Sequence, residues 1–362
     1  MAERILIVGT GLIGGSLGMA LRGAGAGHVV GLDTSLERGE RARERGACDE
    51  AAAGPEAAAD ADLVVVATPV GQILPTIERL AAHTRPGTVV TDTGSAKRVI
   101  VEGAQALLGP DRPFVGGHPM AGTEGEGIEA ARADLFQGAL WALTPTSTTD
   151  PAAYRRVNAL VGRAGARTLA LEPAEHDRLV ALVSHLPYTV ATVLMDVAMG
   201  TSDDRVFSLA AGSFRDVTRT AGSNPSVWRD ILAANRDAVL GALDAFGGEL
   251  DRVRTALRDE DWDSVEAAIE RAREGRRRVR FKGERGPAVP VTLEVFVPDR
   301  AGVLAELTTT LGQAGVNIED LWMDHTAAGG VVYLVVDGEA VAARALQRLS
   351  EGGFRGAMLE ER

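Results

Sequence analysis

The sequence contains very little cysteine and very little lysine. Cys48 is the only cysteine among 362 residues, which excludes a disulfide within the chain and any zinc site built from cysteines. The only lysines are Lys97 and Lys282, so neither is one of many interchangeable surface charges. No apolar run reaches the roughly 18 residues that suggest a membrane span. The chain enters a strand pattern at Ile5 with no signal-peptide pattern before it, and we therefore expect a cytoplasmic protein.

Basic residues are fewer than acidic ones, with 38 Lys and Arg against 50 Asp and Glu. The formal net charge is −12 at pH 7, which argues against a surface that binds nucleic acid. Carboxylates are plentiful, but none clusters with histidines at the spacing of metal ligands, so we expect no metal site. Hydrophobic residues make up 45% and charged residues 24%, as in soluble globular proteins, and the length predicts two or three domains.

Short apolar segments alternate with helical patterns over the first part of the chain. These segments lie at residues 5–8, 29–32, 63–66, 88–91 and 114–116. Nearly continuous apolar strands separated by helices are typical of a parallel sheet covered on both faces. We therefore predict an α/β domain of the Rossmann type over residues 1–148.

The pattern then changes twice. Helical patterns dominate residues 149–282, apart from a strand-like remnant at 167–170, and one helix begins where Asn224 can cap it and Pro225 fits its first position. We predict an all-α domain there and a linker at 283–289. Residues 290–362 follow the order βαββαβ of a ferredoxin-like domain, with strands at 291–297, 316–318, 330–336 and 357–359.

The turn after the first strand fits a dinucleotide-binding fingerprint. Gly9 permits a tight turn, Gly11 lets the backbone approach a pyrophosphate, and Gly14 lets the following helix pack on the strand. Asp33 ends the second strand, where its carboxylate would accept hydrogen bonds from a ribose 2′-hydroxyl and repel a 2′-phosphate. The cofactor is therefore predicted to be NAD.

Small and polar residues follow the later strands, and ligands bind at that edge of a parallel sheet. Thr68 and Pro69 follow the third strand, Ser95 follows the fourth, and His118 lies at the end of the fifth. A neutral imidazole is available as a base near neutral pH because the ordinary histidine pKa is about 6.5. We therefore predict that Ser95 and His118 lie beside the nicotinamide end of the cofactor, with His118 as the catalytic base.

These segments resemble one enzyme family. Residues 92–97 (DTGSAK) and 116–122 (GGHPMAG) are similar to motifs of the prephenate/arogenate dehydrogenases of tyrosine biosynthesis. Further similar motifs are His176-Asp177 and residues 184–187, 214–219 and 224–228. Residues 298–304 and 315–318 resemble an ACT domain. The resemblance implies NAD-dependent oxidative decarboxylation of a cyclohexadienol and makes the helical region a dimerisation domain, so that a homodimer is expected.

The resemblance also implies roles for single residues. His118 would accept the proton of the ring hydroxyl, and Ser95 would bind that hydroxyl or orient His118. Arg219 matches the position that binds the substrate carboxylate, where a guanidinium suits a two-pronged contact. His185, Thr123 and Tyr188 complete the predicted substrate site, whereas Arg215 and His176 are interpreted as surface and structural residues. The predicted cofactor site comprises Gly9, Thr10, Gly11, Leu12, Ile13, Gly14, Asp33, Thr68 and Pro69.

The ACT resemblance implies regulation by an amino acid. Asp299, Gly302 and Asn317 lie at loop ends where such a ligand would bind, and Gly302 begins a helix without a side chain in the way. Feedback inhibition by tyrosine is the hypothesis, with a purely oligomerising role as the alternative.

Other functions stay open at this point. Arogenate, which carries an amino group where prephenate carries a keto group, is the near alternative substrate, since no residue distinguishes the two. An imine reductase or β-hydroxyacid dehydrogenase also joins a nucleotide fold to a helical domain, but the latter usually needs a helix lysine, and none lies between Lys97 and Lys282. An amino-acid-sensing protein with an inactive nucleotide fold is disfavoured by the intact glycine turn, Ser95 and His118.

Overall fold

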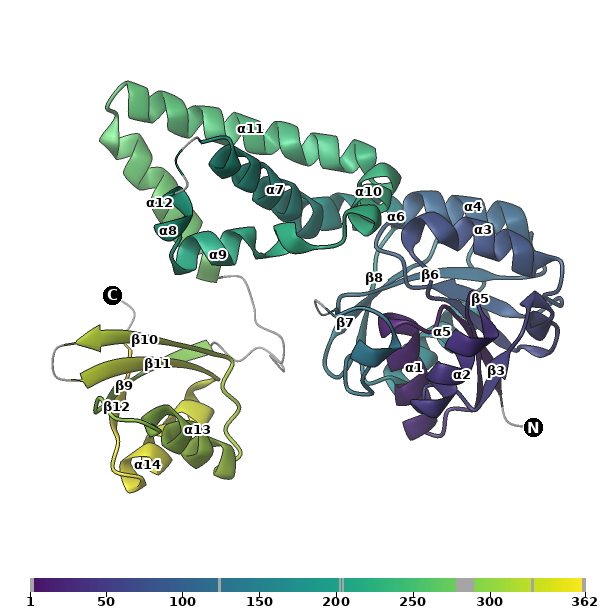
Figure 1. Ribbon diagram of the computed structural model, residues 1–362, viewed down its shortest axis with the longest axis horizontal. Coiled ribbons are helices and arrows are strands. Elements are labelled where there is room, and N and C mark those ends of the chain that lie inside the picture. Colours follow the sequence, from purple (N-terminus) through teal and green to yellow (C-terminus); the bar gives the residue numbers. More distant parts are fainter. Residues whose placement is uncertain are drawn as a thin grey trace. The chain divides into compact units, whose positions relative to one another are not determined.

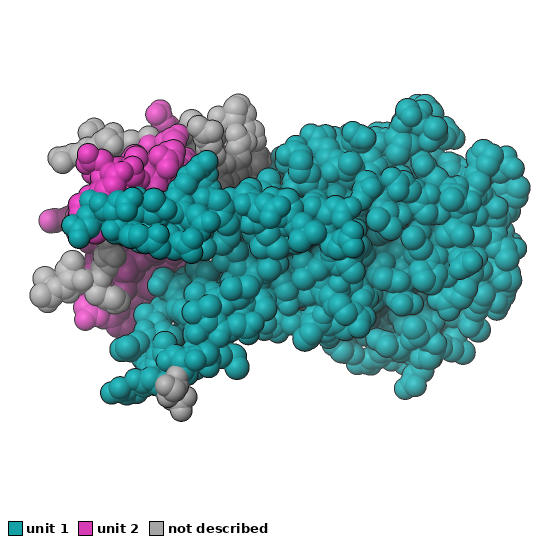
Figure 2. All heavy atoms as spheres, turned by 90° about the horizontal axis from the view of Figure 1, so that it is seen from above, with its two compact units in different colours: residues 1–260 teal, residues 261–362 magenta. Residues whose placement is uncertain are grey.

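The computed structural model describes residues 3–122, 125–201, 203, 205–277, 290–326 and 329–359. The chain divides into two compact units, residues 1–260 and 261–362, which are coloured separately in Figure 2. Each unit is described by itself.

The first unit is built on an eight-stranded sheet. Its strand order is β3-β2-β1-β4-β5-β6-β7-β8. All neighbouring strands pair in parallel except β6 and β7, which are antiparallel. The order reverses between β1 and β4, and a ligand crevice forms at such a reversal in open α/β sheets. The strands are β1 (Arg4–Val8), β2 (His28–Leu32), β3 (Glu50–Ala52), β4 (Leu63–Val66), β5 (Val89–Asp92), β6 (Phe114–Pro119), β7 (Leu140–Thr144) and β8 (Arg167–Ala170).

Helices cover both faces of this sheet (Figure 1). One face packs against α1 (Leu12–Gly23), α2 (Leu36–Glu44) and α5 (Pro151–Arg163), and the other against α3 (Val70–Ala81) and α4 (Arg98–Leu108). The two core clusters contain mainly branched apolar side chains from the strands, which explains why the strands are nearly continuous apolar runs. Short helices η1 (Pro55–Asp60) and η2 (Ile128–Ala130) lie in the connections.

Every strand predicted for the first domain is confirmed within a few residues, but the sheet is larger than predicted. The sequence pattern did not identify β3 or β7, and β8 pairs with β7 in the same sheet. The predicted boundary after residue 148 therefore falls inside this sheet. The remnant at 167–170 was not assigned to it because β8 is an edge strand with mostly exposed side chains, without the apolar run of a central strand.

The rest of the first unit is helical. A continuous helical stretch contains α6 (Pro173–Val180), a π-helical turn η3 (Ala181–His185) and α7 (Leu186–Met199). Pro187 lies two residues after the end of the π turn. A proline inside a helix displaces the hydrogen bonds of the preceding turn, which accounts for the irregular turn there. The backbone beside His185 is opened at this turn. The remaining helices are α8 (Arg205–Ser208), α9 (Gly212–Thr218), η4 (Arg219–Gly222), α10 (Pro225–Ala234) and α11 (Arg236–Arg258).

Large apolar side chains are exposed along α7 and α11. Val193, Val197 and Met199 on α7 and Leu240 and Leu250 on α11 are each more than half exposed. The helical stretch Pro173–Met199 is long and apolar enough, by length and composition alone, to cross a membrane, yet only 22% of its most apolar window is buried within this chain. Such a surface is typical of one that another protein surface covers.

The second unit begins with α12 (Trp262–Arg277) and contains a four-stranded sheet of order β10-β11-β9-β12. Its elements are β9 (Pro290–Val297), α13 (Val303–Gln313), β10 (Asp320–Thr326), β11 (Gly329–Asp337), α14 (Glu339–Glu351) and β12 (Arg355–Met358). The predicted βαββαβ order is confirmed. The strand predicted at 316–318 was wrong: β10 starts at Asp320, and buried Val316 anchors the connection from α13. The predicted linker 283–289 lies outside the described residues.

Candidate active site

The turn between β1 and α1 has the geometry that its glycines predict. Gly9 has a φ of +91°, and a Cβ there would lie 2.6 Å from the carbonyl oxygen of Ala67. A Cβ at Gly14 would lie 1.9 Å from the carbonyl oxygen of Gly9. Both positions therefore require glycine for the close packing of turn, strand and helix.

Gly11 is different, because the space beside it is open. A Cβ at Gly11 would meet nothing nearer than the Cα of Gly127, 4.0 Å away. Gly11 is the N-cap of α1, and no side chain caps that helix end. The backbone N–H groups at the start of α1 are therefore available to an anion, so the turn fits a pyrophosphate.

Asp33 lies beside this turn at the end of β2. Its Oδ2 accepts hydrogen bonds of 2.8 Å from both the backbone N–H and the hydroxyl of Thr10, and its Oδ1 accepts one from the backbone of Thr34. Burial raises the pKa of Asp33, but these hydrogen bonds and the charge of Arg38 outweigh it and hold the pKa below its usual value. The group is therefore an anion at neutral pH, as the prediction of NAD requires. The side chain of Thr10 holds Asp33 against the turn.

A buried ion pair joins the ends of β5 and β6. The ammonium of Lys97 donates to Oδ2 of Asp92 and, at 2.9 Å, to the carbonyl oxygen of Gly117, and both charged side chains are fully buried. Asp92 also accepts from the backbone N–H of Gly94 at 2.8 Å and of Gly117 at 3.1 Å. The pair thereby fixes the loop that carries Ser95 and the strand that carries His118.

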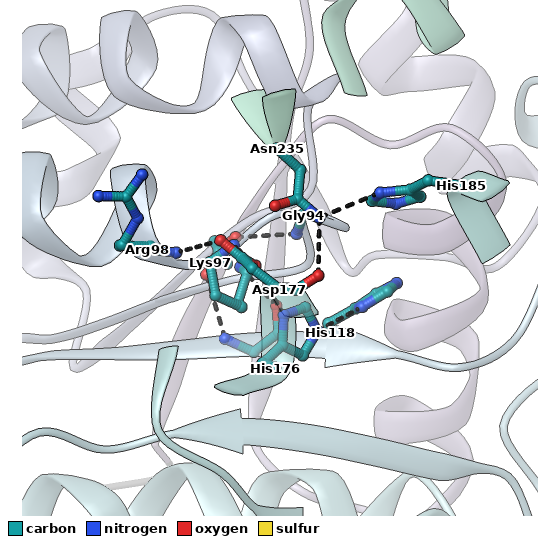
Figure 3. Close-up of polar contacts among 10 residues, drawn as sticks. Gly94, Lys97, Arg98, His118, His176, Asp177, His185 and Asn235 are labelled. Atoms are coloured by element: carbon teal, nitrogen blue, oxygen red, sulfur yellow. Dashed lines mark hydrogen bonds and ion pairs between the residues drawn. The ribbon is translucent and has the colours of Figure 1, made fainter. Parts of the chain in front are cut away.

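His118 is held by a chain of hydrogen bonds that ends on a carboxylate (Figure 3). Its Nδ1 lies 2.9 Å from Nε2 of His176, and Nδ1 of His176 lies 2.9 Å from Oδ1 of Asp177. Asp177 also accepts from the backbone N–H groups of Lys97 and Arg98 at the start of α4, at 2.7 and 2.9 Å. A carboxylate accepts from Nδ1–H of His176, so Nε2 of His176 accepts from Nδ1–H of His118. The lone pair of His118 is then at Nε2, which a base needs.

His185 is a second buried imidazole at this site. Its Nδ1 lies 3.1 Å from the amide nitrogen of Asn235, and its ring is perpendicular to that of Trp228, with ring centroids 6.1 Å apart. Figure 3 shows the rings of His118 and His185 on the same side of Asp177. Burial lowers the pKa of His185 to about 4, although the charge of Asp177 opposes the shift. The ring is therefore neutral at physiological pH.

Several buried polar atoms lack a hydrogen-bond partner among the described residues, and three of them belong to predicted site residues. They are the hydroxyls of Thr68 and Ser95 and Nε2 of His185. Buried polar groups are normally paired, and an unpaired one indicates a missing ligand or water. Thr68 and Ser95 follow β4 and β5 at the predicted edge of the sheet, so these orphaned atoms fit a bound cofactor and a polar substrate.

The structure gathers some of the predicted site residues and not others. His118 is linked to Asp177 through His176, and His185 through Asn235. Ser95 lies two residues before Lys97, whose backbone N–H bonds to Asp177. Tyr188 instead stacks on Trp228, with ring centroids 3.6 Å apart and planes 1° from parallel. Arg219 begins η4, which packs against α7, and its side chain is exposed. Thr123 lies outside the described residues.

The sequence prediction missed the residues that support His118 and His185. His176 was interpreted as structural, although it bonds directly to His118. Nothing singled out Asn235, and Asp177 was only part of a motif. The signal available for His176 and Asp177 was their adjacency in a motif similar to the family's, but no periodicity shows which side chain a residue meets 58 positions away.

Comparison with known proteins gives a consistent assignment for each part of the chain. Residues 17–170 match the nucleotide-binding domain of prephenate dehydrogenase, residues 172–271 match the prephenate dehydrogenase dimerization domain, and residues 291–351 match the ACT domain. The match to the dimerization domain covers the helical region, and the match to the ACT domain covers the ferredoxin-like domain.

Individual relatives cover most of the chain. The prephenate dehydrogenase of Bacillus subtilis is 34% identical over 90% of this chain and 89% of its own length. The cyclohexadienyl dehydrogenase of Zymomonas mobilis is 34% identical over 72% of this chain and 90% of its own length.

Solved structures agree with these relatives. The prephenate dehydrogenase from A. aeolicus in complex with hydroxyphenyl propionate and NAD+ superposes with a TM-score of 0.72, at 32% identity over 76% of this chain and 98% of that one. The Synechocystis arogenate dehydrogenase gives a TM-score of 0.69, at 34% identity over 76% of this chain and 99% of that one.

Proposed function

The chain belongs to the prephenate dehydrogenase family, and from this we propose that it catalyses the NAD-dependent oxidative decarboxylation of prephenate to 4-hydroxyphenylpyruvate in L-tyrosine biosynthesis. The observation that carries the proposal is the hydrogen-bond chain from His118 through His176 to Asp177, which presents a basic nitrogen at the end of β6. Arogenate, with tyrosine as product, is the second candidate because relatives named for either substrate are similarly close in sequence.

The proposed mechanism uses few groups of this chain. Nε2 of His118 accepts the proton of the ring hydroxyl while the hydrogen on the same carbon leaves as hydride. Bound NAD+, held at the Gly9–Gly14 turn and Asp33, would supply the acceptor for that hydride. The bond between the ring and its carboxylate then breaks, and CO2 departs. The electron pair of that bond completes the aromatic ring, and the former hydroxyl oxygen takes the proton back from His118. Ser95 donates to or accepts from the same oxygen, and its orphaned hydroxyl supports this role.

The direct test is formation of NADH from purified protein, NAD+ and either prephenate or arogenate. We expect turnover of prephenate with NAD+ and a much higher KM for NADP+, because the ionised Asp33 would repel the 2′-phosphate. Equal use of NADP+ would contradict the role of Asp33, and turnover of arogenate alone would replace prephenate as the substrate.

Arg219 is proposed to bind a substrate carboxylate. Replacing it with alanine removes a charge-assisted contact of about 1.5–3 kcal/mol, so KM for prephenate should rise about tenfold to hundredfold with kcat changed much less. Arg219→Lys should recover only part of the loss, since an ammonium cannot make the two-pronged contact. Arg215→Ala is the matched control, from the neighbouring helix α9, and should leave KM unchanged. An unchanged KM in Arg219→Ala would exclude carboxylate binding there.

We propose that the protein is a homodimer formed through α7 and α11. The exposed apolar side chains of these helices lie in the region that matches the dimerization domain, and pairing would remove them from water. The apolar stretch Pro173–Met199 is on this proposal an interface helix of a soluble cytoplasmic enzyme.

The ACT domain is proposed to bind tyrosine as a feedback inhibitor. Gly302 has a φ of +85° at the start of α13, and nothing lies within 4 Å of where its Cβ would be, so the backbone is open to a ligand. Asp299 precedes that helix by a few residues and Asn317 follows it by a few, and both side chains are exposed. Calorimetry with the full chain should show tyrosine binding that Asp299→Ala/Asn317→Ala weakens without changing prephenate turnover; no binding at millimolar tyrosine would leave only an oligomerising role.

A further inference from the structure

Asp177 supports two separate branches of hydrogen bonds. Its carboxylate orders His118 through His176, as described above. Its backbone carbonyl oxygen accepts from the amide nitrogen of Asn235 at 2.9 Å, and that nitrogen also lies 3.1 Å from Nδ1 of His185. Asn235 and His185 are both buried, so water does not compete for these contacts.

The carbonyl of Asp177 settles which way the Asn235 amide points. A backbone carbonyl can only accept, so the atom facing it must be the NH2 group and not the amide oxygen. The same nitrogen has a second hydrogen, which it donates to Nδ1 of His185. That ring nitrogen must therefore carry a lone pair.

A neutral imidazole has one N–H, so the proton of His185 is at Nε2. This is the buried atom that lacks a hydrogen-bond partner among the described residues. The ring of Trp228 lies beside the imidazole, and the Asn235 amide, bonded to the Asp177 carbonyl, lies at Nδ1, so that the described residues offer Nε2 no acceptor. An orphaned donor of this kind lies ready for an acceptor that arrives with the substrate.

We propose that Asn235 is a positioning residue that holds His185 as a hydrogen-bond donor to a carboxylate or keto oxygen of the substrate. This rests on the proposed dehydrogenase function and adds the chemical class of the recognised group. The site thereby pairs opposite histidines: His118 presents an acceptor to the hydroxyl, and His185 presents a donor to an oxygen. An ammonium group has no lone pair and cannot occupy the place facing His185.

The test compares two replacements of His185. His185→Gln can place an amide N–H near the position of Nε2, whereas His185→Leu has no donor. We expect KM for prephenate to rise about tenfold to hundredfold in His185→Leu, the effect of losing one hydrogen bond to a charged group, and to stay within about threefold in His185→Gln. The kcat should change little in either, because His118 is kept. Equal KM values in the two variants would overturn the proposal.

A second measurement does not depend on activity, and its main arm uses the wild-type protein. Nitrogen-15 NMR of the wild-type histidines distinguishes protonated from unprotonated ring nitrogens. We expect His185 with Nδ1 unprotonated and Nε2 protonated in the free protein, and a mixture of both tautomers in Asn235→Leu. A proton on Nδ1 of wild-type His185 would refute the inference even if prephenate is turned over. Absence of prephenate turnover together with the expected tautomer would instead refute the function alone.

Discussion

His118→Asn should lose almost all turnover while it continues to bind both NAD+ and prephenate. A positioned general base contributes about 10²–10⁴ in rate, and asparagine has no lone pair of comparable basicity for the hydroxyl proton. Its amide can still bond to His176, so the strand end and Asp177 should remain in place. The measurements are kcat from NADH formation and binding of each ligand by calorimetry. His83→Asn, at an exposed histidine of the same unit, is the control and should keep full activity.

The pH dependence of the wild-type enzyme tests the same residue. Burial lowers the pKa of His118 well below its usual value, and the neighbouring His176, Lys97 and His185 lower it further. A base acts only when it is unprotonated, so kcat/KM should stay flat as the pH falls from 7 through 6.5 and decline only below that. A decline centred at the ordinary histidine pKa of about 6.5 would show that the base is a solvent-exposed group and not His118.

The second large effect concerns stability. Lys97→Met should lower the free energy of unfolding by about 3–5 kcal/mol, because it leaves the carboxylate of Asp92 buried without its charge partner. Asp92→Asn/Lys97→Met should recover part of the loss, since the buried charge is gone and the amide oxygen can still accept from one of the two backbone N–H groups, that of Gly94 or that of Gly117. Urea unfolding of the three proteins gives the comparison.

A surface pair provides the control for that experiment. Arg85 and Asp62 also form an ion pair in the first unit, but their side chains are 50% and 32% exposed. Arg85→Met should cost at most about 1 kcal/mol, as for other exposed pairs. A loss in Lys97→Met no larger than that in Arg85→Met would mean that water or a rearranged side chain compensates Asp92. The site itself should also suffer, because Lys97 bonds to the carbonyl oxygen of Gly117, next to His118.

Local patterns predicted the parts of the fold that depend on local physics. Buried parallel strands need apolar residues on both faces, so β1, β4 and β5 were visible as short apolar runs. β8 was not assigned to the sheet, since it lies at the edge and most of its side chains are exposed. The strand predicted at 316–318 failed for a related reason: Val316 is buried, but burial in a connection leaves the same apolar signal as burial in a strand.

The sequence by itself determined the cofactor turn and the edge of the sheet where chemistry occurs. Gly9 and Gly14 have no room for a side chain, and Asp33 follows a strand, so each constraint acts within a short segment. Only the tertiary structure decided how the two histidines are used. His118, His176 and Asp177 meet across 58 residues, and His185 and Asn235 meet across 50. Because a tautomer is set by whichever donor or acceptor faces each ring nitrogen, no one-dimensional pattern could assign His118 as an acceptor and His185 as a donor.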